Sequence, residues 1–173
     1  PYTDCVYQPM QEVLAVLQHH GFKTYIVSGG GVELIRVFAG AAYGIPPEQV
    51  IGSTIATRFE IRDDQPVLVR LPQIDFINEQ AAKPASIHRT IGRRPLIAFG
   101  NSDGDFEMLE WTTSAPGRRL GVLLHHTDPD REYAYNRATL FGRLDRGLDA
   151  APQRGWTLVD MQTDFRRIFA FDA

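Results

Sequence analysis

The feature that most constrains the fold of this chain is the alternation of short apolar runs with amphipathic segments of about a dozen residues. The runs at 22–28, 94–101, 118–127 and 156–161 are predicted strands. The predicted helices include 9–20, 78–92, 104–115, the exposed segment 128–138, which Asp128 can cap, and 140–155. Strands separated by such helical segments form a parallel sheet with helices on both faces. The sequence therefore predicts the α/β class, with three layers (α/β/α) and a mostly parallel sheet.

One segment departs from this alternation. Residues 56–71 alternate around the turn sequence Asp63-Asp64-Gln65-Pro66, which is typical of a β-hairpin. We predict a hairpin insertion over 53–72 within one core domain that spans 1–173, because 173 residues suit a single domain. The chain starts without Met, and we expect the native N-terminus to lie upstream of Pro1.

Composition limits the classes of partner. A net charge of -3 gives no electrostatic reason to expect nucleic acid or an anionic membrane surface as a partner. No apolar stretch approaches the roughly 20 residues that a membrane helix needs. The single cysteine excludes an internal disulfide framework and a zinc site built from cysteines. We expect a small-molecule ligand and favour a cytoplasmic location; the oligomeric state is left open.

Two unusual loops follow predicted strands directly. In an α/β sheet, ligands bind at the carboxyl ends of the strands, so these loops are the candidate sites. The first loop places Ser28 before three glycines and a helix. A helix N-terminus with free N–H groups and a nearby hydroxyl suits a phosphate group. A tight turn in which glycine supplies an unusual backbone conformation is the equal alternative.

The second loop, residues 100–105, contains Asn101, Asp103 and Asp105. Their oxygens are of the kind that Mg²⁺ prefers, and close carboxylates repel one another unless a cation relieves them. A solvated turn that caps the following helix is the alternative. Lys83 lies near the start of a predicted helix, where the helix dipole disfavours a cation unless a phosphate is close.

Together these features resemble the haloacid dehalogenase (HAD) superfamily, with the phosphoserine-phosphatase-like branch nearest. The shared features are a serine at a strand end, a lysine in a later helix, and a strand that runs into "GNSDGD". The order and spacing match across roughly residues 9 to 125, and the hairpin matches the same branch. The resemblance implies a Rossmann-like domain that hydrolyses phosphate monoesters with Mg²⁺.

The resemblance also implies a role for each matched residue. Ser28 and the Gly29 N–H would bind the phosphoryl oxygens, and Lys83 would neutralise the phosphate and the nucleophile. Asp105 would anchor the metal shell directly, through water, or by holding Lys83. Asn101 lies where the family has an acidic metal ligand, and its amide oxygen can still coordinate. Asp103 could compensate for the missing charge.

The family's first motif, an aspartate pair D-x-D-x-T/V after a strand, is not found in this sequence. The nearest matches are "DPDRE" at 128–132 and "DGDFE" at 103–107, and both have Glu where Thr or Val belongs. We therefore expect the nucleophilic aspartate upstream of Pro1 and expect this chain alone to be inactive. Two alternatives stay open: a non-catalytic phosphate- or nucleotide-binding domain and, less favoured, a receiver domain.

Overall fold

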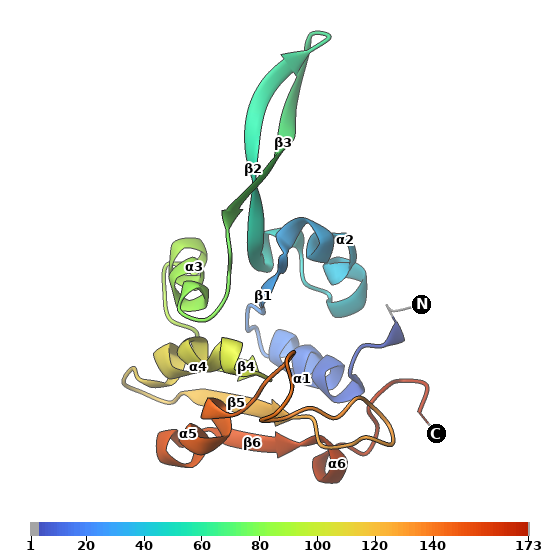
Figure 1. Ribbon diagram of the computed structural model, residues 1–173, viewed down its shortest axis with the longest axis vertical. Helices are drawn as coiled ribbons and strands as arrows, with labels where there is room; N and C mark the ends of the chain where they lie inside the picture. Colours follow the sequence, from blue (N-terminus) through green and yellow to red (C-terminus); the bar gives the residue numbers. More distant parts are fainter. Residues whose placement is uncertain (1–3, 173) are drawn as a thin grey trace. The chain divides into compact units, whose positions relative to one another are not determined.

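The computed structural model describes residues 4–172. Its chain contacts separate two compact units, one formed by residues 1–24 with 79–173 and the other by residues 25–78. Each unit contains a sheet of its own, as the labelled strands of Figure 1 show.

The first unit is built on a parallel sheet with the strand order β4-β5-β6. Its strands are β4 (Ile97–Gly100), β5 (Leu120–His125) and β6 (Thr157–Asp160). Ile97 pairs with Leu120, and Val122 pairs with Thr157, so all three strands end at the same edge. The carboxyl ends of β4 and β5 therefore lie side by side.

Helices α4 (Phe106–Thr113) and α5 (Arg146–Arg154) connect these strands. The unit also contains α1 (Gln8–His19), α3 (Ala82–Ile91) and α6 (Met161–Asp164), with a 3-10 turn η3 (Asp103–Asp105). Leucines from β5, α4 and the segment before α5 form much of the core, because Leu109, Leu123 and Leu144 are all at most 1% exposed. Helix α4 contacts both β4 and β5.

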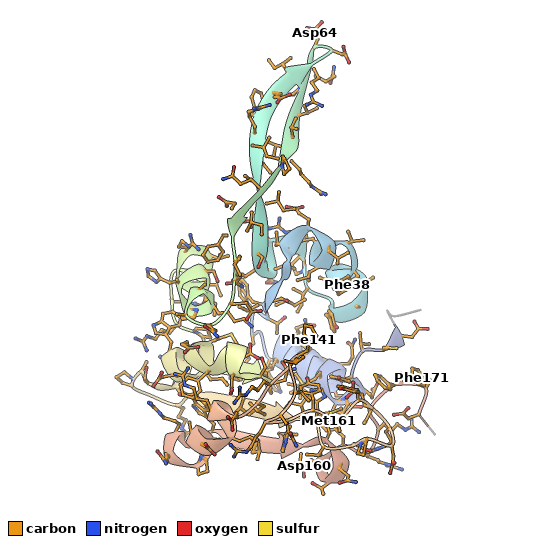
Figure 2. All side chains as sticks on the ribbon, in the orientation of Figure 1. Phe38, Asp64, Phe141, Asp160, Met161 and Phe171 are labelled. Carbon is orange, nitrogen blue, oxygen red and sulfur yellow. The ribbon has the colours of Figure 1, made fainter. Side chains whose placement is uncertain are left out.

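The second unit combines a parallel strand pair with a long hairpin. Its elements are β1 (Ile26–Gly31), α2 (Val32–Tyr43), η2 (Pro47–Gln49), β2 (Val50–Arg62) and β3 (Gln65–Phe76). Strand β1 pairs with β2 in parallel, and β2 pairs with β3 in antiparallel orientation. Figure 2 labels Asp64 at the tip of the hairpin.

The predicted α/β class, the parallel strands with connecting helices and the hairpin are confirmed. The hairpin strands are longer than the predicted insertion 53–72, because their pairing extends from Thr54–Phe76 to Arg62–Gln65. Whether residues 1–173 form one domain stays a prediction. None of the helices within residues 4–172 has the length and apolar character needed to cross a membrane.

The prediction of a helix directly after β5 is wrong. Residues 128–138 form turns, because Asp128 accepts hydrogen bonds from the N–H groups of Asp130 and Arg131 and closes a local turn. Asp128 is also buried, at 4% exposure, and pairs with the Arg131 guanidinium. The following helix begins at Arg146 rather than near residue 140. Local side-chain bonds to the backbone thus replace the helix ladder in this segment.

Candidate functional site

The loop after β4 folds tightly around the Asp105 side chain. A Cβ atom at Gly100 would lie 2.5 Å from the Cβ of Asp105, so only glycine leaves room for this approach. One Asp105 oxygen, Oδ2, accepts the backbone N–H groups of Asn101 at 3.0 Å and Ser102 at 3.3 Å. The loop therefore closes on the carboxylate of Asp105, which is itself 5% exposed.

Lys83 binds the other oxygen of the same carboxylate. Its Nζ lies 2.6 Å from Asp105 Oδ1, and Lys83 is only 5% exposed. Pro84 follows in the first turn of α3, where a proline is tolerated because its missing N–H has no helical partner. Of the three predicted ways in which Asp105 could serve the site, the structure shows the contact that holds Lys83.

Asp103 is used to hold α5. Its carboxylate accepts the N–H groups of Asp145 at 3.2 Å, Arg146 at 3.2 Å and Gly147 at 2.9 Å. These are groups at the start of α5, which have no partner inside the helix and favour a negative charge. Asp103 therefore ties the strand-end loop to α5, which occupies both of its oxygens.

Asn101 contacts a group of residues that the sequence analysis missed. Its Nδ2 donates to the Tyr135 hydroxyl, and the Tyr135 ring stacks on His126 at 4.1 Å between centroids. His126 Nδ1 lies 3.1 Å from Glu132, which also accepts the Tyr7 hydroxyl at 3.1 Å. Adjacent histidines on a strand are a weak signal in a sequence, so this cluster could not be assembled from spacing alone.

Burial sets the protonation of this cluster. It raises the pKa of Tyr135 to about 12, so the phenol stays protonated at neutral pH. It also lowers the pKa of His126, although the contact with Glu132 acts in the opposite direction. His126 is thus expected to be neutral at pH 7, with the Nδ1 proton donated to Glu132.

In the second unit, Ser28 and Gly29 lie near the end of β1. The Ser28 hydroxyl oxygen accepts the Gly30 N–H at 3.0 Å, which closes a short turn. Ser53 donates to the Gly29 carbonyl at 2.7 Å, and the buried Asn78 donates to the Ser28 carbonyl at 3.0 Å. Ser53 and Asn78 were not predicted. Ser53 lies within β2 and Asn78 follows β3, and both hold the backbone at Ser28 and Gly29.

The six predicted site residues therefore divide between the two units. Within the first unit, Lys83, Asn101 and Asp105 form one connected cluster, and Asp103 points to α5. Ser28 and Gly29 form their turn in the second unit.

Mg²⁺ is the ion that the family resemblance implies, and it would be held by side-chain oxygens of Asn101, Asp103 and Asp105. Among the described residues no group of three or more His, Cys, Asp or Glu side chains could hold a metal. Asp105 and Asp103 already bind Lys83 and the start of α5, which leaves the neutral Asn101 side-chain oxygen. Mg²⁺ requires an octahedral set of oxygens. The described residues do not fit this ion on their own.

Comparison with known protein families identifies the family of this chain. A model of the haloacid dehalogenase-like hydrolases matches residues 2–110, which is more than half of the chain. The chain belongs to this HAD family. The family prediction made from Ser28, Lys83 and the "GNSDGD" loop is thereby confirmed.

A solved structure is also similar, the crystal structure of a phosphoserine phosphohydrolase-like protein from Francisella tularensis subsp. tularensis SCHU S4. It is 21% identical in sequence, with a TM-score of 0.46, over 69% of this chain and 51% of that chain. This chain thus spans about half the length of that protein. A search of curated proteins gave no match.

Proposed function

We propose that this chain supplies the phosphate-binding and charge-neutralising part of a HAD-type phosphatase that acts on a small phosphate monoester. The branch that we propose is the phosphoserine-phosphatase-like one. The observation that carries the proposal is the buried pair of Lys83 and Asp105 at the end of β4. The pair holds the Lys83 side chain at a strand end, which is where ligands bind in α/β folds.

The chemistry follows from what these groups can donate. An ammonium group has three donors, and the bond to Asp105 uses one of them. The remaining donors of Lys83 would bind phosphoryl oxygens and stabilise the charge that develops in the transition state. The Ser28 hydroxyl and the Gly29 N–H, in the second unit, are the other groups proposed to bind phosphoryl oxygens.

The covalent step needs a carboxylate nucleophile. In the proposal an aspartate from a segment outside these 173 residues attacks phosphorus, the alcohol leaves, and water then releases inorganic phosphate. The support for this is the lack of a D-x-D-x-T/V sequence in the chain. The described residues do not fit Mg²⁺ on their own. A bound Mg²⁺ ion would therefore need further carboxylate ligands.

A second candidate is a non-catalytic phosphate-binding domain. The observation that favours it is the use of Asp103 and Asp105 as internal anchors, together with the neutral Asn101 where the family has an acid. Such a domain would not hydrolyse p-nitrophenyl phosphate even when the chain is extended by the segment that carries the proposed nucleophilic aspartate. Turnover by that longer protein, lost in its Asp105→Asn variant, distinguishes the phosphatase from the binding domain.

The proposed function is tested with p-nitrophenyl phosphate. We expect the chain alone to release no more nitrophenol than its Asp105→Asn variant, with or without Mg²⁺, while the unsubstituted chain binds inorganic phosphate. Turnover that the substitution abolishes would contradict an external nucleophile and would direct attention to Asp103 and Asp128. The lack of both turnover and phosphate binding would contradict the phosphate site itself.

A further inference from the structure

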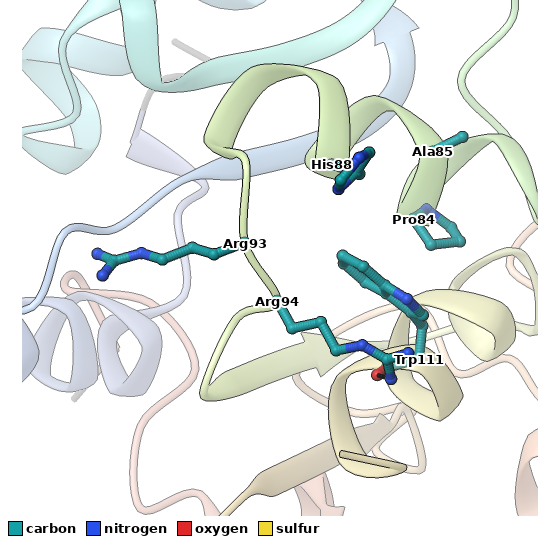
Figure 3. A pocket seen from close by; sticks show the side chains of 6 residues that line it. All are labelled: Pro84, Ala85, His88, Arg93, Arg94 and Trp111. Carbon is teal, nitrogen blue, oxygen red and sulfur yellow. Dashed lines mark hydrogen bonds between the residues drawn. The ribbon is translucent and has the colours of Figure 1, made fainter. Parts of the chain in front are cut away.

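A cavity that is wide open to solvent lies between α3 and α4 in the first unit. It has a volume of about 490 Å³, and Figure 3 shows its side chains. The lining residues are Pro84, Ala85, His88, Arg93, Arg94 and Trp111. In the figure the rings of His88 and Trp111 border the same space, while the Arg93 side chain extends away from them. The proposed phosphatase function does not use this cavity.

Hydrogen-bond donors dominate the polar side chains of this cavity. Arg94 and the Trp111 indole can only donate, and His88 can donate from either ring nitrogen. Arg94 uses one nitrogen, Nη1, for the Trp111 carbonyl at 2.6 Å and the Ser114 hydroxyl at 2.8 Å. Among the described residues, nothing accepts a hydrogen bond from Arg94 Nε, Arg94 Nη2 or Trp111 Nε1. A ligand for this cavity must therefore supply acceptors.

The positive charge of Arg94 is not neutralised by a neighbouring acid. Both of its described partners are uncharged oxygens. The acids on α4 pair elsewhere, Glu107 with Arg146 at 2.7 Å and Glu110 with Arg154 at 2.6 Å. The lining residues described for this cavity include no Asp or Glu. An anion would supply both the missing charge and the missing acceptors.

The remaining surface of the cavity is apolar. The Arg94 guanidinium carbon lies 4.9 Å from the Trp111 ring centroid, so the cation and the indole form one continuous wall. Pro84 and Ala85 lie opposite this wall on α3. A planar ring can stack on such surfaces while an anionic group on its edge reaches the guanidinium.

We propose that the cavity between α3 and α4 binds a small aromatic anion, whose charged group pairs with Arg94 and whose ring packs against Trp111. His88, exposed on α3, closes the other side of the ring and donates to the anionic group.

The proposal is tested by titrating the chain with benzenesulfonate and recording the two indole N–H signals by NMR. Trp156 is an internal control, because it is buried and its Nε1 donates to Thr113 at 2.9 Å. We expect a saturable shift of the Trp111 signal alone. Neutral benzenesulfonamide should bind at least about tenfold more weakly, and inorganic sulfate should also bind more weakly because it lacks the ring.

Variants separate the charge from the fold. Arg94→Gln should weaken benzenesulfonate binding about tenfold or more, and His88→Gln, at an exposed position, should weaken it less. The matched control is Arg119→Gln, because Arg119 also donates to a backbone carbonyl, that of Pro95 at 2.6 Å, but does not line the cavity. Equal binding of the sulfonate and the sulfonamide, no shift at Trp111, or unchanged binding by both variants would overturn the proposal.

Discussion

Lys83 and Asp105 are opposite charges inside the first unit, and each depends on the other because neither is exposed to water. Removing one partner of such a pair leaves a buried charge, which costs far more than the pair itself contributes. We therefore expect Lys83→Met to lower the free energy of unfolding by about 3–5 kcal/mol. Urea denaturation followed by circular dichroism measures this.

The control for this substitution is Lys23→Met, since Lys23 is the other lysine of the chain and is exposed. The double variant Lys83→Met with Asp105→Asn should recover part of the loss, because no charge is then buried alone. Equal free energies of unfolding for Lys83→Met and Lys23→Met would contradict the buried ion pair.

Asp103 is predicted to matter for stability rather than for ligand binding. Its carboxylate accepts three N–H groups at the start of α5, and hydrogen bonds to charged groups are worth more than neutral ones. Asp103→Asn should lower the free energy of unfolding by about 1–3 kcal/mol. Thermal unfolding beside the exposed control Asp130→Asn tests this, and unchanged phosphate affinity should accompany the loss.

These residues show what a sequence can and cannot predict at this scale. The order of Ser28, Lys83 and the "GNSDGD" loop was enough to find the family, and the contact of Asp105 with Lys83 was one of three roles that the resemblance implied for this acid. The partner of each acid was not predictable, because Asp103 and Asp105 are two residues apart yet contact α5 and α3 respectively. Tyr135, which holds Asn101, lies 34 positions away in a segment that was predicted as an exposed helix.

Among the elements, the β2–β3 hairpin has an unfavourable turn. Asp63 and Asp64 have φ values of 49° and 57°, a left-handed conformation that two-residue hairpin turns need and that an Asn-Gly pair adopts more readily. The double substitution Asp63→Asn with Asp64→Gly should raise the free energy of unfolding by about 1 kcal/mol. Calorimetry of the chain measures the melting temperature; a decrease would contradict the described turn.

The contact of β1 with β2 depends on a glycine. A Cβ atom at Gly52 would lie 2.7 Å from the Gly30 carbonyl oxygen and 3.0 Å from the Val32 nitrogen, and backbone atoms cannot easily move away. Gly52→Ala should destabilise the chain by about 1–3 kcal/mol. Gly31→Ala is the matched control, because its added Cβ would have no atom within 4 Å; equal denaturation midpoints would contradict the close approach.

The elements themselves were predictable where the hydrophobic period was clear. Strand β4 and helix α1 lie within a few residues of their predicted bounds, since their apolar spacing and flanking Gly or Pro residues act locally. The conformation of segment 128–138 was not predictable in this way, because it depends on the hydrogen bonds of Asp128 and on the pairing of His126 with Tyr135. The secondary-structure propensities of the residues do not predict such interactions.

For the molecule as a whole, acid stability should depend on His126. Its pKa in the folded chain is lowered, mainly by burial, so the unfolded chain binds more protons just below the ordinary value near 6.5. Stability is then fully present above about pH 6.5 and is lost as the pH falls toward the folded value. Unfolding between pH 7 and pH 5 should show this loss.

Variants identify the group responsible. His126→Gln should flatten the pH dependence of the unfolding free energy in this range, whatever its effect at pH 7. The control His20→Gln, at an exposed histidine, should leave the dependence unchanged. A pH dependence that persists in full in the His126 variant would show that other groups cause it.

Our central proposal is that the chain binds phosphate and that Ser28 in the second unit and Lys83 in the first unit are phosphate-binding residues. The most direct measurement is a calorimetric titration with inorganic phosphate of the Arg94→Gln chain, in which the proposed second anion site is removed. The account predicts saturable binding that Ser28→Ala weakens about tenfold, as expected for the loss of a hydrogen bond to a charged group. Ser114→Ala serves as the control. The absence of phosphate binding, or equal phosphate affinities of the Ser28→Ala and Ser114→Ala variants, would contradict the central proposal.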